Sequence, residues 1–189
     1  MNSRERVLTA IDHRQPDRLP ITFDAEKEVI DALMRHFGVG TRDAVWDALH
    51  VDTRLIGADH HYPHIREENG VRYDFWGIGD KEQPYSGGTY WEYCYHPLAD
   101  THSVSEIEAY DWPTPDELSF ESLREARRAN PDKAMIAHIT HGGYFKATHL
   151  RGMERFMLDL GEDPELAAAI IGRVTDYLYP ALERLCREA

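Results

Sequence analysis

The order of apolar and polar residues along the chain predicts a series of short helices. Val7, Leu8 and Ile11 recur at helical spacing near the N-terminus, and Asn2 or Ser3 can serve as the N-cap. The same spacing predicts further helices over residues 29–37, 42–49, 104–110, 120–129, 144–150, 153–160 and 164–189. Because strands separate these helices, the pattern indicates a mixed α/β chain.

Three short apolar runs predict strands between the helices. Residues 19–23 (LPITF) alternate apolar and polar positions, and residues 53–57 (TRLIG) form a brief run that is followed by polar groups. Residues 134–140 (AMIAHIT) form the third run, and a glycine pair after it leads into a helix. This strand, the glycine turn and the helix together predict a βα unit.

Residues 71–95 predict a β-hairpin insertion. Apolar residues alternate with polar ones from Val71 to Phe75, and Gly87 with Gly88 can turn the chain back. The aromatic residues of this hairpin suit either cross-strand packing or a lid that stacks on a flat ligand, and packing is the commoner role.

Composition and charge narrow the classes of partner. The 189 residues include 34 acidic and 21 basic side chains, which gives a formal net charge of −13 without a local run of lysine or arginine. Because this charge repels phosphate backbones and anionic lipids, we expect neither a nucleic acid nor a membrane partner. The N-terminus lacks the apolar core of a secretion signal, so we expect a cytoplasmic protein. Cys94 and Cys186 predict neither a disulfide framework nor a thiolate zinc site.

Four segments, in this order, resemble the uroporphyrinogen decarboxylase superfamily. They are SRERVLTAIDHRQPDRLPITF at 3–23, EYCYHPLAD at 92–100, SEIEAYDWPTPDEL at 105–118 and HGGYFKATHLRGMERFMLDLGEDPEL at 141–166. The resemblance implies a (β/α)8 barrel enzyme, and such a barrel takes about 250 residues. Residues 1–189 are therefore expected to form the N-terminal part of a TIM barrel, with residues 71–95 as the hairpin insertion.

A partial barrel leaves sheet edges and an apolar face uncovered. Three explanations compete: the chain is a fragment of a longer protein, it pairs with a separately encoded C-terminal half, or it forms a homodimer. A fragment is the favoured interpretation, because half of a divided core is rarely stable alone.

In barrel enzymes, reacting groups stand at the C-terminal ends of strands and in the loops that follow. This rule selects Asp59, His60, His138 and His141 as candidate catalytic residues, together with Thr140. Imidazole and carboxylate groups can transfer protons near neutral pH or hold a polar substrate. In the decarboxylases of the family, a strand of this type ends in an aspartate that holds the pyrrole nitrogens, and the resemblance matches Asp59 to it.

Asp24, Gly142, Gly143 and Tyr144 are the candidate substrate-binding residues. Asp24 follows the first predicted strand, and the glycine pair before a helix can present backbone N–H groups to a substrate carboxylate. Each position also has a structural interpretation, since Asp24 can cap the next helix and the glycines can serve only the turn. His138 likewise suits a hydrogen-bonded position in the core.

The sequence ADHHYPH places His60, His61 and His64 beside Asp59, and imidazole is a good ligand for transition metals. Adjacent residues of a strand point to opposite faces, so His60 and His61 are not expected to bind one ion. A histidine-rich surface loop is the favoured interpretation, and no metal site is predicted.

Residues 19–38 indicate which branch of the superfamily the chain resembles more. Decarboxylases carry an arginine-rich stretch here, in outline RPVWFMRQAGRY, whereas residues 19–38 (LPITFDAEKEVIDALMRHFG) contain the single arginine Arg35. A heavily anionic substrate would find few partners there. The resemblance therefore favours the corrinoid-linked methyltransferases over lyase activity in porphyrin biosynthesis, with a non-catalytic binding or assembly half-barrel as a further alternative.

The methyltransferase branch also sets expectations for cofactors and partners. Those relatives use a corrinoid, and they hold zinc through a histidine and cysteines in the second half of the barrel. The chain is therefore expected to hold no cofactor by itself and to be inactive alone. Its expected partners are a small-molecule substrate or a corrinoid protein.

Overall fold

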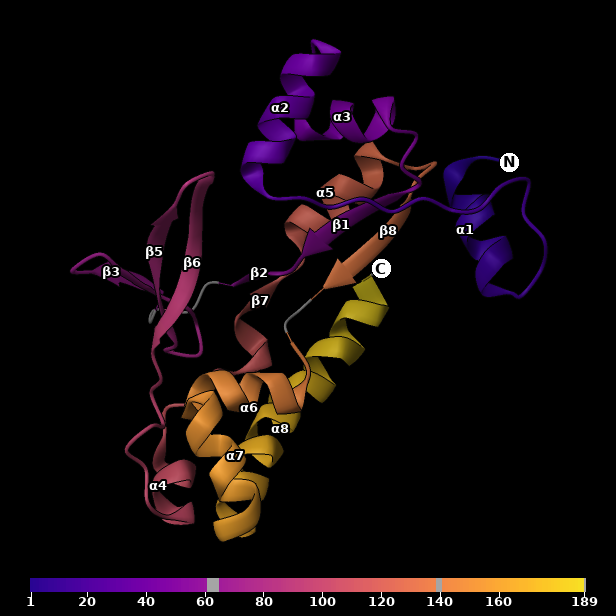
Figure 1. The fold of residues 1–189 in the computed structure, drawn as a ribbon. Coiled ribbons are helices and arrows are strands. Elements are labelled where there is room, and N and C mark those ends of the chain that lie inside the picture. The colour runs from indigo at the N-terminus through magenta and orange to yellow at the C-terminus, as the bar shows by residue number, and fades with distance from the viewer. Residues whose placement is uncertain (61–64, 139–140, 189) are drawn as a thin grey trace. The chain divides into compact units, whose positions relative to one another are not determined.

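The computed structural model describes residues 1–60, 65–138 and 141–188, and these form two compact units (Figure 1). Unit 1 comprises Met1–Gly57 and Glu121–His138, and unit 2 comprises Ala58–Phe120 and Ile139–Ala189. Each unit combines helices with strands, which confirms the mixed α/β class. No described helix combines the length and the apolarity needed to cross a bilayer.

Unit 1 places helices around a parallel pair of strands. Its elements are α1 (Ser3–Ile11), α2 (Lys27–Phe37), α3 (Arg42–Ala48), β1 (Thr53–Gly57), α5 (Glu121–Ala129) and β8 (Ala134–His138). Helices α1 and α5 pack against this pair of strands. Parallel strands need a crossover connection, and α5 lies on the return path to β8.

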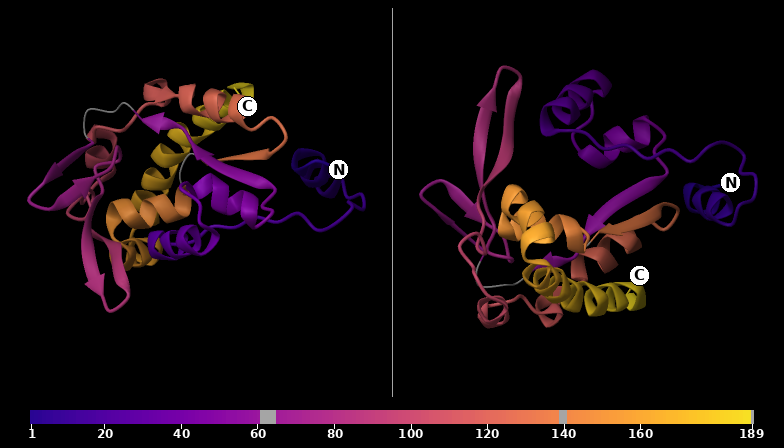
Figure 2. Two further views of the ribbon diagram at one scale, coloured as in Figure 1. Left: turned by 90° about the horizontal axis from the view of Figure 1, so that it is seen from above. Right: turned by 60° about the horizontal axis from the view of Figure 1, so that its bottom comes forward.

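Strands β1 and β8 lie side by side in both views of Figure 2. Their register runs from Thr53 opposite Ala134 to Gly57 opposite His138. Two of the strands predicted from apolar runs are therefore present and parallel. The last two residues of the predicted run 134–140 lie outside the described residues.

The predicted strand at residues 19–23 is absent: these residues belong to no strand or helix. The backbone N–H of Asp52 donates to the Ile21 carbonyl at 2.8 Å, whereas the Ile21 N–H donates to the Asp52 side chain at 2.8 Å. Pro20 has no N–H to offer. The bond from the Ile21 N–H to the Asp52 side chain thus takes the place of a backbone bond between two strands. Residues 19–23 therefore do not pair as a regular strand.

Helix α1 begins as predicted but buries a different face. Asn2 caps it, and Glu5 completes a capping box by bonding back to the Asn2 backbone. Leu8 and Ile11, expected on the buried face, are 42% and 65% exposed, whereas Arg6 is 7% exposed. The helix is anchored by ion pairs of Arg6 rather than by its apolar residues.

Unit 2 combines an antiparallel sheet with a helical layer. Its strands are β2 (Asp59–His60), β3 (Arg66–Glu68), β4 (Val71–Tyr73), β5 (Gly79–Tyr85), β6 (Gly88–Tyr95) and β7 (Leu118–Ser119). Its helices are α4 (Val104–Ala109), α6 (Gly143–Arg151), α7 (Met153–Glu162) and α8 (Pro164–Glu188), with a 3-10 turn at Pro115–Glu117. Strands β2 and β7 pair antiparallel.

A hairpin of β5 and β6 lies within residues 71–95, where a hairpin was predicted. Tyr85 pairs with Gly88, so Gly88 begins β6 and the two residues before it form the turn. Strands β3 and β4 extend the hairpin to a sheet in the order β3-β4-β5-β6, beginning at Arg66. The antiparallel region is thus larger than the sequence predicted.

The helical layer of unit 2 is organised along α8, which contacts α4, α6 and α7 (Figure 1). Asp163 caps α8 through a bond from the Leu166 N–H at 3.2 Å, and Pro164 is its first residue. The face of α8 that the periodicity predicted is buried at Leu166, Ile170, Val174, Tyr177 and Leu185, together with Ala167 and Ala181. Leu182, which the periodicity placed on the same face, is 49% exposed. This layer fixes the position of α6.

Candidate functional site

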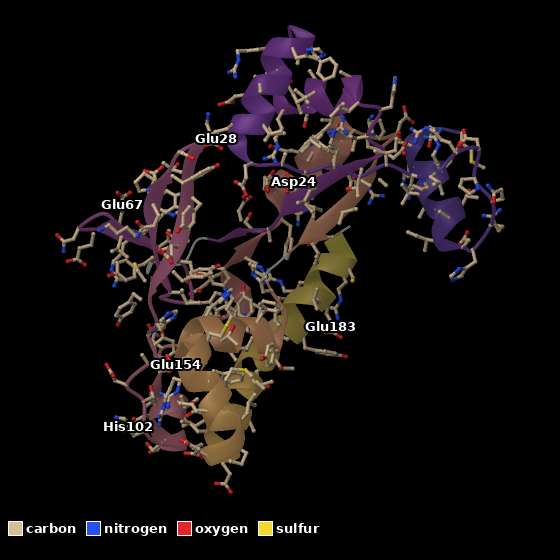
Figure 3. All side chains as sticks on the ribbon, viewed as in Figure 1. Asp24, Glu28, Glu67, His102, Glu154 and Glu183 are labelled. Atoms are coloured by element: carbon tan, nitrogen blue, oxygen red, sulfur yellow. The ribbon has the colours of Figure 1, made fainter. Side chains whose placement is uncertain are left out.

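The candidate residues chosen from sequence are divided between the two units. In unit 1, Asp24 lies in the loop before α2 (Figure 3) and its carboxylate pairs with the Arg42 guanidinium and accepts the Ala25 N–H. Asp24 does not cap α2, whose N-cap is Glu26. His138 ends β8 opposite Gly57.

In unit 2, Asp59 and His60 form β2 and pair with Ser119 and Leu118. Asp59 is exposed. His61, His64 and Thr140 lie outside the described residues. Because the candidate residues belong to different units, a common site formed by Asp24, Asp59, His138 and His141 stays a prediction.

The glycine pair and Tyr144 open helix α6. Gly142 is the N-cap, and its carbonyl accepts the Lys146 N–H at 3.0 Å. The Tyr144 hydroxyl donates to Met157 Sδ at 3.0 Å, and its ring lies 5.7 Å from that of Phe156 on α7. Tyr144 therefore packs α6 against α7, while substrate binding by these residues stays a prediction.

One turn further along α6, a buried lysine pairs with an aspartate whose side chain is 36% exposed, and the sequence did not indicate this pair. Lys146 is 4% exposed, and its Nζ lies 3.6 Å from Asp74 Oδ2 and 5.5 Å from the centre of the Trp76 ring. The backbone N–H groups of Trp76 and Ile78 donate to Asp74 Oδ1, each at 2.9 Å. The Asp74 carboxylate is thus fixed, and it orients the ammonium group.

Burial shifts the proton affinity of both partners. It raises the pKa of Asp74, while the positive charge of Lys146 opposes that shift. It also lowers the pKa of Lys146, and Asp74 opposes that shift in turn. In both groups, burial therefore favours the neutral form over the charged one.

His149 lies one further turn along α6. Its ring packs against that of Tyr93 on β6, with 4.2 Å between centroids and a tilt of 35°, and its centroid lies 5.6 Å from that of the His141 ring. Its buried Nδ1 has no hydrogen-bond partner among the described residues, while its backbone carbonyl lies 2.6 Å from His96 Nδ1. Burial, followed by the charge of Lys146, lowers the pKa of His149 to about 4.

We call Asp74, Tyr93, His141, Lys146 and His149 the α6 site. At neutral pH it offers an uncharged imidazole beside the Lys146 amine, which pairs with Asp74. Strongly shifted pKa values are characteristic of functional sites, although structural ion pairs also produce them. The arrangement suits hydrogen bonding to a polar substrate group.

Of the α6 site, the sequence indicated His141 as a candidate catalytic residue and Tyr93 as one of the hairpin aromatic residues. A usable signal existed for Lys146 and His149, since they stand three positions apart on a predicted helix and therefore share a face. Asp74 lies 72 positions before Lys146 in a different type of element, so nothing local linked the two. The folded structure alone brings them together.

Replacing Lys146 with Met is expected to raise the pKa of His149, because a neighbouring positive charge disfavours the imidazolium. The pKa should stay below 6.5, since burial is its largest perturbation. Titration of the imidazole carbon-bound protons by NMR measures it. Lys133→Met, which removes a lysine of unit 1, is the matched control and should leave His149 unchanged. Titration of His149 near 6.5 in the unaltered chain would contradict the assignment.

With this geometry established, comparison with known proteins gives one informative match. No protein-family model and no curated protein matches the chain. A solved structure of a methyltransferase from Methanosarcina mazei is similar in fold, with a TM-score of 0.65 at 12% sequence identity. The match covers 100% of this chain and 57% of the methyltransferase. The chain therefore has a methyltransferase-like fold and spans little more than half the length of that neighbour.

Proposed function

We propose that the chain forms the N-terminal part of a (β/α)8 barrel enzyme of the uroporphyrinogen decarboxylase superfamily, of the corrinoid-linked methyltransferase type. The observation that carries this proposal is the match of the whole chain to part of a methyltransferase. The four sequence segments that resemble the superfamily support it independently. Because fold similarity alone is weak support for an activity, the proposed activity also depends on the chemistry of the α6 site and on the experiment described below.

The parallel strands of unit 1 support the view that further strands are required. Leu55 and Ile136 stand directly opposite each other on β1 and β8 and are 54% and 43% exposed. Parallel sheets occur almost only where both faces are covered. A parallel pair with exposed apolar residues is therefore characteristic of a sheet that continues in a larger assembly.

The α6 site supplies the polar contacts that we assign to this chain. Lys146 donates to a polar group of the substrate, Asp74 holds the ammonium in place, and His149 stays uncharged and available for a hydrogen bond. When present, a corrinoid supplies the methyl group that is transferred. The donor set at the α6 site fits a small polar group, so we place no corrinoid contact there.

Zinc is not assigned to the described residues. Among residues 1–60, 65–138 and 141–188, no three side chains of His, Cys, Asp or Glu are grouped as metal ligands. Activation of a thiol by zinc, as expected for this branch, would therefore depend on ligands from elsewhere in the complete enzyme.

Binding of hydroxocobalamin and of uroporphyrin, each titrated calorimetrically into the purified chain, tests the choice of branch. We expect at least tenfold tighter binding of the cobalamin, because a net charge of −13 repels the carboxylates of the porphyrin. Lys146→Met should leave cobalamin affinity unchanged, since Lys146 is assigned to the small substrate. Preferential binding of uroporphyrin would instead favour decarboxylase activity.

A further inference from the structure

The segment that follows strand β6 binds the last turn of helix α6. The Leu98 N–H donates to the Leu150 carbonyl at 3.0 Å, and Arg151 Nη1 donates in the opposite direction, to the carbonyls of Leu98, Ala99 and Thr101. Leu98, Leu150 and Arg151 are buried, so this contact lies in the interior of unit 2. The segment therefore fixes the end of α6 relative to β6.

His96 is the first residue of this segment, and it reaches a residue of the α6 site. Its Nδ1 lies 2.6 Å from the carbonyl oxygen of His149. Because a carbonyl can only accept, His96 Nδ1 carries the proton and donates it to this bond. Helix α6 ends at Arg151, so the His149 carbonyl belongs to the last turn, where a helix supplies no N–H of its own. His96 thus provides the donor that the helix lacks.

His149 is held at two points by residues that stand three positions apart. Tyr93 packs against the His149 ring, with 4.2 Å between centroids, and His96 binds the His149 backbone. A functional side chain is placed precisely when packing and supporting hydrogen bonds both restrain it. The end of β6 and the residue after it provide both restraints for His149.

The His96 ring is itself oriented by a contact on its other edge. A Cβ atom placed on Gly152 would lie 3.5 Å from His96 Cδ2 and 4.0 Å from His96 Nε2, so the ring packs beside the Gly152 backbone. Gly152 has a φ of 83°, a conformation that favours glycine. The ring is therefore held with its Nδ1 towards His149.

We propose that His96 is a positioning residue of the α6 site: its bond to the His149 carbonyl holds the His149 imidazole against Tyr93, in the place from which it binds the substrate. This inference rests on the function proposed for the α6 site. In this role His96 acts through His149 rather than on the substrate. Because exact placement determines how well a polar group serves a reacting substrate, loss of the bond should impair the site even though every residue of the site is still present.

The position of the proton on His96 tests the bond in the unaltered chain. Long-range proton–nitrogen NMR correlations show which ring nitrogen is protonated. We expect neutral His96 to carry its proton on Nδ1, because the partner of this nitrogen is a carbonyl. A proton on Nε2 instead would overturn the proposal, and this measurement does not depend on the folding of any variant.

A pair of substitutions separates the hydrogen bond of His96 from its charge. His96→Asn keeps a side-chain N–H near the position of Nδ1, whereas His96→Leu fills a similar space without a donor. Both variants remove the charge of His96, which is one of the causes that lower the pKa of His149. The pKa of His149 should rise further above about 4 in His96→Leu than in His96→Asn, because an imidazole that is no longer held gains contact with water. NMR titration of His149 measures this difference.

Methyl transfer by the completed protein gives a second comparison of the same variants. Turnover should fall roughly tenfold with His96→Leu and be largely restored with His96→Asn. His102→Leu, which alters an exposed histidine of the same unit, is the control and should change neither turnover nor the pKa of His149. Circular dichroism checks that each variant is folded.

Equal pKa values of His149 in the His96→Leu and His96→Asn variants would overturn the positioning role, as would equal turnover of the two. The proton position and the pKa are measured without methyl transfer. A failure of this inference is therefore distinguishable from a failure of the proposed function, which the cobalamin titration tests.

Discussion

Replacing Arg151 with Met is expected to lower the free energy of unfolding by about 3–5 kcal/mol, the usual cost of removing one partner of a buried ion pair. Arg151 is 0% exposed, and its Nε donates to Asp159 Oδ2 at 2.6 Å. Its Nη1 also donates to the carbonyls of Leu98, Ala99 and Thr101 at 2.5, 3.0 and 2.7 Å. The substitution removes the buried donor of the Asp159 carboxylate, which keeps its pair with Arg155, and a donor of three carbonyls, of which that of Leu98 still accepts the Thr101 N–H at 3.2 Å.

The matched control for Arg151 uses the same carboxylate. Arg155 also pairs with Asp159, at 3.4 Å, but its side chain is 48% exposed. Solvent screens such a pair, so Arg155→Met should cost no more than about 1 kcal/mol. Urea unfolding followed by circular dichroism measures both variants. Equal losses would show that burial of Arg151 is not what stabilises this part of unit 2.

The second large effect is expected at Asp52 in unit 1. Its side chain is 0% exposed and accepts bonds from Arg6 Nη1 at 2.6 Å, Arg18 Nη1 at 2.7 Å and the Ile21 N–H at 2.8 Å. These bonds tie helix α1 and the segment at residues 18–21 to the residue that precedes β1. Asp52→Asn should therefore destabilise the protein by about 3 kcal/mol, as expected when a buried charge loses its partner.

Asp52 also gives the stability a defined pH dependence. Burial alone would raise the pKa of Asp52, but the hydrogen bond from Arg18, with further bonds, lowers it from 3.8 to about 2. The folded state thus releases this proton more readily than the unfolded state does. Its stabilisation is complete above pH 3.8 and is lost as the pH falls towards about 2.

Urea unfolding of the unaltered chain and of Asp52→Asn across this pH range tests the assignment. The variant should lose stability less steeply, because it no longer takes up a proton at Asp52 on unfolding. Some acid sensitivity should remain, since the hydrogen bond from Arg6 also lowers the pKa of Asp17. Identical pH slopes for the two chains would contradict the role given to Asp52.

Asp52 also explains why one of the three strands predicted from sequence is absent. Strands β1 and β8 were predictable because each is a compact apolar run bounded by polar residues. Residues 19–23 have an equally regular alternation, yet their pairing is taken over by the Asp52 side chain. A bond between residues 31 positions apart leaves no trace in a local pattern.

The buried face of helix α1 and most residues of the α6 site were not predicted, for a related reason. Local periodicity assumes that apolar residues are the ones buried, but Arg6 and Lys146 are buried because distant carboxylates pair with them. The helices themselves were predictable from spacing and caps. Which of their faces lies inside depends on partners that the sequence does not identify.

The central claim is that this chain supplies the first part of a methyl-transferring barrel. Its most direct test is loss of cobalt-bound methyl from methylcobalamin to a thiol, followed by absorbance, with the chain alone and joined to a polypeptide that supplies the remaining strands. The account predicts turnover only in the completed protein, and at least a tenfold loss of turnover with Lys146→Met. Full turnover by the chain alone, or decarboxylation of uroporphyrinogen without methyl transfer by the completed protein, would contradict it.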